Sequence, residues 1–519
     1  MRFKSVFDNN ERNFYLLFTL TVVSVFFTNP LLIYPYDVYT HLQWIDIQNN
    51  AVSVPKVRYV WHYVWANIFH FLHIETTQIF LRAYVIHFTQ VLTSFFILFY
   101  FSRVIIRNLF IKSTPIESNY LAYWATIIWF TVFATYSVNQ HQVWILWYSV
   151  NYQISLPFTL LITGLSVSLA LEHLSLKIKI IYILLILLFS YVILRIHPME
   201  YIYYLMYMGI LFLIFIDKFI GLWKKNRYYS IPLTLAAIFI LTQLISFAKS
   251  SSYHKSSIVN YLSFEKLPEL LSKIHTEGRL LVNHLNRASV SINELIYLSL
   301  FLIVVMCILV LYRHYKKYPS YVNIRIAIFL LITSFFVLIP LSEFAGGLAS
   351  IVIYTAVVHR FYYSALLFLV IPGFIFYILT LMKIKNLLLT NLAIVLVLLG
   401  VFFYSKYIST THNYYKNSIS IKNAFNKEKM KFNLSNKEIE IIGEKIQYYE
   451  SLNNTHKKIM YYARDDIAFV IKFIYRKPVL YYSRGSKNYL NSYHSHKKKE
   501  YSPILFKTPK GFPSYVRYK

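Results

Sequence analysis

The feature that most constrains this chain is a series of long apolar segments that fill most of its first 404 residues. A helix needs about 20 apolar residues to cross the hydrocarbon core of a bilayer, and the segments have about that length. Only 14% of the residues are charged, whereas soluble domains are about a quarter charged. The sequence therefore excludes an ordinary soluble enzyme and predicts a polytopic membrane protein.

Apolar segments ended by charge, proline or polar clusters predict an all-α bundle of about eleven transmembrane helices. The first segment is too long, and too poorly followed by small residues, for a cleaved signal peptide, so we expect it to be a retained span. The predicted spans lie near residues 13–35, 77–101, 119–138, 153–171, 179–195, 200–220, 231–248, 294–312, 326–342, 361–381 and 386–404.

Positive charge gathers in alternate loops, which predicts the orientation of the bundle because cytoplasmic loops are rich in Lys and Arg. A cytoplasmic N-terminus places all these loops on the inner side, and an odd number of spans then places the C-terminus outside. The inner set comprises Arg2, Lys4, Arg12, Arg103, Arg107, Lys112, Lys177, Lys179, Lys224, Lys225, Arg227, Arg313, Lys316, Lys317, Arg325, Lys383 and Lys385.

The predicted outer side is the more elaborate one. Residues 1–404 form the transmembrane domain, with long outer loops at 36–76 and 249–293. Residues 405–519 are polar and Lys-rich, and a strand, helix and strand over 457–485 predict a small α/β extracytoplasmic C-terminal domain. We expect residues 490–519 to be a loose basic end. Because this tail lies outside, its basicity indicates anionic lipid or polysaccharide rather than nucleic acid.

The first outer loop holds the most informative polar pair. Asp37 lies where the chain leaves the bilayer, and in a helix it shares a face with His41 at i and i+4. A partly desolvated carboxylate beside an imidazole is suited to act as a general base. A helix cap or an interfacial polar pair is the structural alternative.

An acidic residue at the start of the first outer loop, followed by an aromatic segment at 57–73, resembles the integral-membrane glycosyltransferases of the GT-C superfamily. The inner N-terminus, about eleven spans and an outer C-terminal domain are similar too. The resemblance implies transfer of a sugar from a polyprenyl-phosphate donor to an extracytoplasmic glycan, lipid or protein acceptor, with Asp37 as the matching acid. The chain shows no eukaryotic sorting signal, so we expect a bacterial inner membrane.

A lipid-phosphate donor needs cationic contacts near the outer membrane surface, and the planar fork of Arg suits phosphate oxygens. Two short loops each place two donors together, at 195–197 and 359–360. A lone outer Arg otherwise extends to lipid headgroups. We also expect a functional acid at the end of the ninth span. The candidate binding residues are Arg58, Arg195, His197, Glu200, Arg279, Arg287, Glu343, His359 and Arg360.

Two other functions remain open. An O-antigen or capsule-type polysaccharide polymerase would depend on Arg279, His284 and Arg287 in the second long loop. A non-enzymatic transporter of lipid-linked oligosaccharide would carry polar groups at mid-membrane. The sequence has no phosphate-binding loop and no dinucleotide fingerprint, so we expect no cofactor. No residue set predicts a metal site, and the sequence leaves the need for a divalent cation open.

Overall fold

The structure is a computed structural model of the whole chain. It describes residues 18–19, 31–32, 45, 59–74, 79–129, 151–217, 220–221, 242, 266–287, 291–352, 358, 361–369, 371–372, 418–419, 436–453, 458–463, 467, 470–471, 475, 477, 479–481 and 501–505.

Helices dominate the described residues, and four of them are long and apolar enough to cross a membrane. These stretches are Leu81–Leu109, Ile154–Leu171, Leu176–Ile196 and Ile324–Leu341. The first two lie within α4 (Ile79–Leu109) and α7 (Asn151–Leu171), and the third is α8 (Leu176–Ile196). The fourth joins α14 (Ile324–Ser334), a 3-10 turn and α15 (Leu338–Leu341). The prediction of a helical membrane-type chain agrees with these elements.

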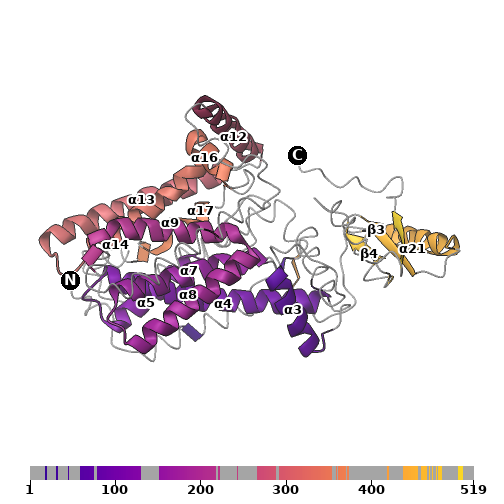
Figure 1. The fold of residues 1–519 in the computed structure, drawn as a ribbon, viewed down its shortest axis with the longest axis horizontal. Coiled ribbons are helices and arrows are strands. Elements are labelled where there is room, and N and C mark those ends of the chain that lie inside the picture. Colours follow the sequence, from indigo (N-terminus) through magenta and orange to yellow (C-terminus); the bar gives the residue numbers. More distant parts are fainter. Residues whose placement is uncertain are drawn as a thin grey trace.

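Other helices lie beside these four or at the ends of the bundle (Figure 1). The predicted spans at 13–35, 231–248 and 386–404 fall almost wholly outside the described residues. Within residues 1–404, the remaining described helices are α3 (Tyr59–Phe71), α5 (Pro115–Ile128), α9 (Pro198–Ile214), α12 (Leu267–Arg287), α13 (Ser291–Lys317), α16 (Glu343–Val352) and α17 (Phe361–Ser364).

Three of the positively charged loops meet at one end of the bundle. The amide of Ile111 donates to the Tyr321 carbonyl at 3.1 Å, and the amide of Asn323 donates to the Leu109 carbonyl at 2.8 Å. At the same end the Asn108 side chain donates to the Glu172 carboxylate at 3.4 Å. The turns after α4, after α7 and before α14 are therefore neighbours, as alternate crossing directions require.

The packing of the bundle distinguishes protein-facing from outward-facing helices. The apolar stretch of α7 is 72% buried inside the protein. Gly164 allows α7 to pack closely on α4, because a Cβ there would lie 3.3 Å from the Phe101 ring. The apolar stretch of α8 is only 11% buried, and its exposed residues include large aliphatic ones such as Leu184 and Leu188. A surface of this kind suits contact with lipid, because helix–helix interfaces in membranes favour small residues.

Two predicted spans differ from the structure at their boundaries. Residues Leu31–Leu32 form β1, which pairs antiparallel with β2 (Ser418–Ile419), so the first predicted helix cannot extend to residue 35. The Asn29-Pro30 step in the sequence favours a boundary here, because proline disfavours helical backbone in the residue before it. The predicted span at 361–381 begins instead with α17, a break, and a 3-10 turn at Leu367–Leu369. At this break the Tyr207 hydroxyl donates a hydrogen bond to the Ser364 carbonyl, so this carbonyl has a partner that does not belong to its own helix.

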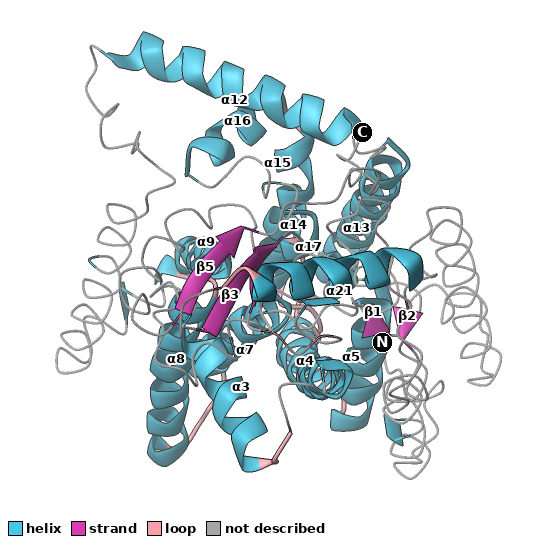
Figure 2. Cartoon of the chain, turned by 90° about the vertical axis from the view of Figure 1, so that its right-hand side faces the viewer, coloured by secondary structure: helices cyan, strands magenta, loops and turns pink. Residues whose placement is uncertain are grey.

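The described part of the tail contains a helix and a parallel sheet. Helix α21 (Asn436–Ser451) is followed by β3 (Lys458–Ala463), β4 (Val479–Tyr481) and β5 (Tyr501–Leu505), in the sheet order β4-β3-β5. Helix α21 lies next to β3 (Figure 2), and buried residues of the two elements share a small core. The expectation of a loose basic end was wrong at β5, which is an edge strand. Its Pro503 fits an edge because proline lacks an amide to donate.

Candidate functional site at the α8–α9 turn

The turn between α8 and α9 is the best-defined polar feature at the end of the bundle opposite the positively charged loops. Helix α8 ends at Ile196 and α9 begins at Pro198, so His197 alone joins them. Proline disfavours helical backbone in the residue before it, and His197 is accordingly extended, with φ −159° and ψ 90°. Its amide still donates to the Ile193 carbonyl at 2.8 Å, which completes the last turn of α8.

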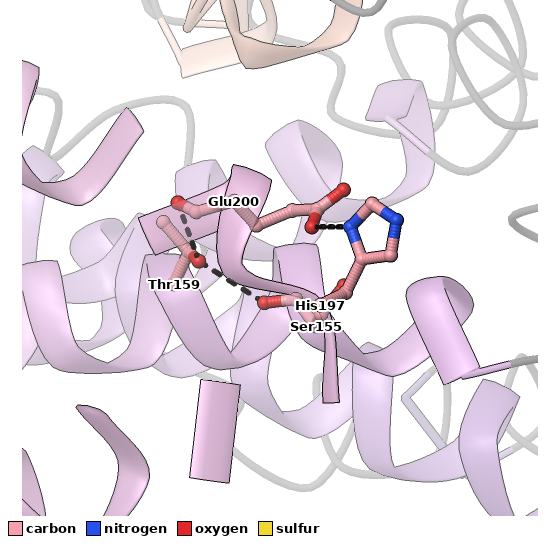
Figure 3. Close-up of polar contacts among 4 residues, drawn as sticks. All are labelled: Ser155, Thr159, His197 and Glu200. Atoms are coloured by element: carbon pink, nitrogen blue, oxygen red, sulfur yellow. Dashed lines mark hydrogen bonds and ion pairs between the residues drawn. The ribbon is translucent and has the colours of Figure 1, made fainter. Parts of the chain in front are cut away.

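Glu200 occupies the first turn of α9, where its carboxylate contacts Nδ1 of His197 (Figure 3). A glutamate in this position usually accepts from the backbone amide of the capping residue. Here that amide is already bonded to Ile193, so the carboxylate binds the imidazole instead. The partial positive charge of the helix N-terminus also favours a carboxylate at this place.

Both members of the His197–Glu200 pair are shielded from solvent. Their side chains are 11% and 4% exposed, respectively. Charge that is removed from water is stable only when it is paired and hydrogen-bonded. Figure 3 shows Nε2 of His197 on the side of the ring turned away from Glu200. An imidazole oriented by a carboxylate in this way can accept or donate a proton at Nε2.

Helix α7 contacts the start of α9 through Thr159. The Thr159 hydroxyl lies 3.1 Å from the Ser155 carbonyl and 3.1 Å from the Glu200 carbonyl (Figure 3). One hydroxyl proton serves both oxygens, so this side chain couples α7 to the start of α9. We did not predict Thr159 as a site residue. The spacing of Ser155, Thr159 and Thr163 on one helical face was the signal in the sequence.

Arg195 does not join His197 as a second donor, contrary to our expectation. Its guanidinium lies over the Tyr191 ring, 5.4 Å from the centroid, on the exposed side of α8. The two side chains diverge because Arg195 is still helical, whereas His197 is in the extended connection. Instead, His197 contacts Glu200, which was predicted as a binding residue from the same loop.

A second polar cluster forms where α12 crosses α16. Nδ1 of His275 lies 2.8 Å from the Glu343 carboxylate, and Nε of Arg279 lies 3.5 Å from the same oxygen. All three side chains are well exposed. Arg279 and Glu343 were predicted separately, and the structure brings them together. His275 was missed, although it lies one helical turn before Arg279.

The α12–α16 crossing depends on glycine. A Cβ on Gly278 would lie 2.8 Å from the Glu343 side chain, and a Cβ on Gly347 would lie 2.9 Å from the Ile274 carbonyl carbon. Backbones can approach this closely only where side chains are absent. The predicted loop at 249–293 therefore contains a packed helix, α12, rather than irregular chain alone.

The remaining predicted residues have no described side chain. Asp37, His41, Arg58, His359 and Arg360 lie outside the described residues, and Arg287 is described only as part of α12. Among the described residues, no group of three or more His, Cys, Asp or Glu side chains is placed to hold a metal ion.

Comparison of the chain with protein-family models, with curated proteins and with solved structures finds no match.

Proposed function

We propose that this chain is an integral-membrane glycosyltransferase of the GT-C type that uses a polyprenyl-phosphate-linked sugar. The observation that carries the proposal is the shielded His197–Glu200 pair at the turn between two apolar helices. A lipid-linked phosphate would reach such a turn from the bilayer. In the proposed topology this end of the bundle faces outward, because the positively charged loops gather at the other end.

The proposed reaction displaces the lipid phosphate from the sugar. The acceptor hydroxyl attacks C1, the bond between C1 and the phosphate oxygen breaks, and polyprenyl phosphate leaves with the electron pair. Asp37 takes the acceptor proton, as the resemblance to the superfamily implies. Nε2 of His197 donates to a phosphate oxygen of the donor, and Glu200 holds the ring for that contact.

The proposal includes a topology. Eleven spans, a cytoplasmic N-terminus and an outer α/β domain at 405–519 place Asp37 and the α8–α9 turn on one side of a bacterial inner membrane. The alternation of described helix ends supports this arrangement. The bilayer, the lipid-linked donor and an extracytoplasmic glycan, lipid or protein are then the partners.

The test is sugar transfer by purified protein in proteoliposomes supplied with polyprenyl-phosphate sugar. A charge-assisted hydrogen bond contributes about 1.5–3 kcal/mol, so His197→Gln and Glu200→Gln should each lower kcat/KM for the donor by about 10- to 150-fold. Arg195→Gln is the matched control, because its guanidinium lies over Tyr191. Transfer that is unchanged in folded Glu200→Gln contradicts this role.

A polysaccharide polymerase is the second candidate. The observation that favours it is the exposed pair His275 and Arg279 on α12, both facing Glu343. Substituting Arg279 with Gln should abolish polymerisation under this alternative and leave donor use nearly unchanged under the first proposal. The comparison of Arg279→Gln with Glu200→Gln therefore distinguishes the two.

A further inference from the structure

Helix α12 ends next to α13, which the sequence predicts to be a span, and α16 begins where the membrane-length stretch Ile324–Leu341 ends. Only residues 288–290 separate α12 from α13, and Ser342 alone separates α15 from α16. One end of each helix is therefore fixed at the level where a span leaves the hydrocarbon core. Figure 2 shows α12 at the margin of the bundle, running in a different direction from α13.

The two helices pack through the middle of their apolar faces and leave other parts uncovered. Ile274, Gly278 and Leu281 of α12 are buried against α16. Leu271, one turn before Ile274 on the same face, is 48% exposed. On α16, Phe344 and Leu348 are 61% and 44% exposed and lie at i and i+4. Both helices thus present an apolar ridge that is exposed among the residues the structure describes.

The opposite side of α12 is mostly polar, with Leu280 as an exposed apolar residue among polar ones. Ser272 and Thr276 lie on it, both exposed, and the Thr276 hydroxyl donates to the Ser272 carbonyl at 2.9 Å. A helix with one apolar and one polar face, fixed at a span boundary, fits the plane of the membrane interface. On α13, Leu298 and Leu302 are exposed apolar residues of the kind that lipid covers in a membrane protein.

We propose that the α12–α16 pair is a membrane-surface anchor whose uncovered apolar ridge inserts into the outer headgroup layer of the same bilayer. The direct junction of α16 with the membrane-length stretch that ends at Leu341 favours lipid over a partner protein or a second copy. The anchor holds the His275–Arg279–Glu343 cluster at headgroup level. This inference does not depend on the sugar chemistry proposed above.

The single native cysteine makes the test specific, because Cys307 is buried and introduced cysteines are accessible to a thiol-reactive fluorophore. The experiment uses the full chain in proteoliposomes of phosphatidylethanolamine and phosphatidylglycerol. Leu271→Cys and Leu348→Cys place the label on the apolar ridge, and Thr276→Cys is the matched control on the polar face. Quenching is measured with aqueous iodide and with lipid that carries a doxyl group near its headgroup.

Labels on the ridge should show blue-shifted emission, strong quenching by the doxyl lipid and little by iodide, and the Thr276→Cys label should show the reverse. Iodide quenching at Leu271→Cys and Leu348→Cys equal to that at Thr276→Cys overturns the proposal. Protection from both quenchers with cross-linking to a second copy also overturns it, in favour of a dimer contact. Leu267→Cys, one turn earlier on α12, gives the same readout if Leu271→Cys fails to fold.

Discussion

The close contact between α12 and α16 yields a quantitative prediction at Gly347. A Cβ added there overlaps the Ile274 carbonyl oxygen and lies 2.9 Å from the carbonyl carbon and 3.1 Å from the Gly278 amide nitrogen. All three are backbone atoms, so no side-chain rotation can relieve the overlap. Gly347→Ala should therefore force the two helices apart, at the cost of overpacking of about 1–3 kcal/mol.

Gly209→Ala in α9 is the matched control, because a Cβ at Gly209 meets nothing within 4 Å. Both substitutions gain helix propensity of about 1 kcal/mol, and this gain cancels in the comparison. The difference between them isolates the α12–α16 contact. Local opening of α12 should become more favourable by about 1–3 kcal/mol, which corresponds to about 5- to 150-fold faster amide exchange.

The assay is hydrogen exchange by mass spectrometry on the protein in nanodiscs, followed on peptides from α12. Gly347→Ala should accelerate exchange in α12 and leave α4 and α7 unchanged, whereas Gly209→Ala should leave α12 at the wild-type rate. Equal exchange in α12 for the two variants would refute the close backbone packing and, with it, the geometry of the cluster at Glu343.

Three further predictions concern stability. Thr159→Val removes the hydrogen bond from α7 to the Glu200 carbonyl and should lower the free energy of unfolding in mixed micelles by about 0.5–1.5 kcal/mol. Thr163→Val should cost less, because the Thr163 hydroxyl bonds to a carbonyl within α7. Equal losses for the two variants would contradict the coupling of α7 to α9. Leu184→Arg on α8 should lower stability by about 2.5–3.5 kcal/mol in a bilayer, and a loss no greater than that of Leu184→Ala would show that α8 does not face lipid. Asp217→Asn breaks a bidentate ion pair with Arg325, whose two N···O distances are 2.6 and 2.9 Å. Because the pair is exposed, the loss in unfolding free energy should stay below about 1 kcal/mol and shrink with salt. A loss above about 2 kcal/mol would contradict this.

The sequence predicted those features of the fold that local physics determines. Segment length and apolar content place α7 and α8 closely, because a helix that crosses a bilayer needs a fixed number of apolar residues. Helix α4, in contrast, continues to Leu109, well past the predicted end at residue 101. Three of the loops predicted on one side, after α4, after α7 and before α14, lie next to one another. Boundaries were less accurate where a proline or a long-range hydrogen bond intervenes, as at Pro30 and Ser364.

The candidate site was predictable only in part. The His-Pro step and the glutamate three residues after His197 were visible in the sequence, and together they specify the break and its partner. The separation of Arg195 from His197 required knowing where α8 ends. The meeting of Arg279 with Glu343 depends on glycines in two distant segments, and such tertiary contacts leave no periodic signal in one sequence.

The most direct test of the central proposal is to supply the reconstituted protein with a polyprenyl-phosphate sugar that carries one isotope in the sugar and another in the phosphate. The proposal predicts that the two labels separate, with the sugar in the acceptor and the phosphate in the lipid, and that separation falls sharply in Asp37→Asn and Glu200→Gln. If both labels cross the bilayer together and the bond stays intact, the chain is a transporter and the glycosyltransferase proposal is wrong.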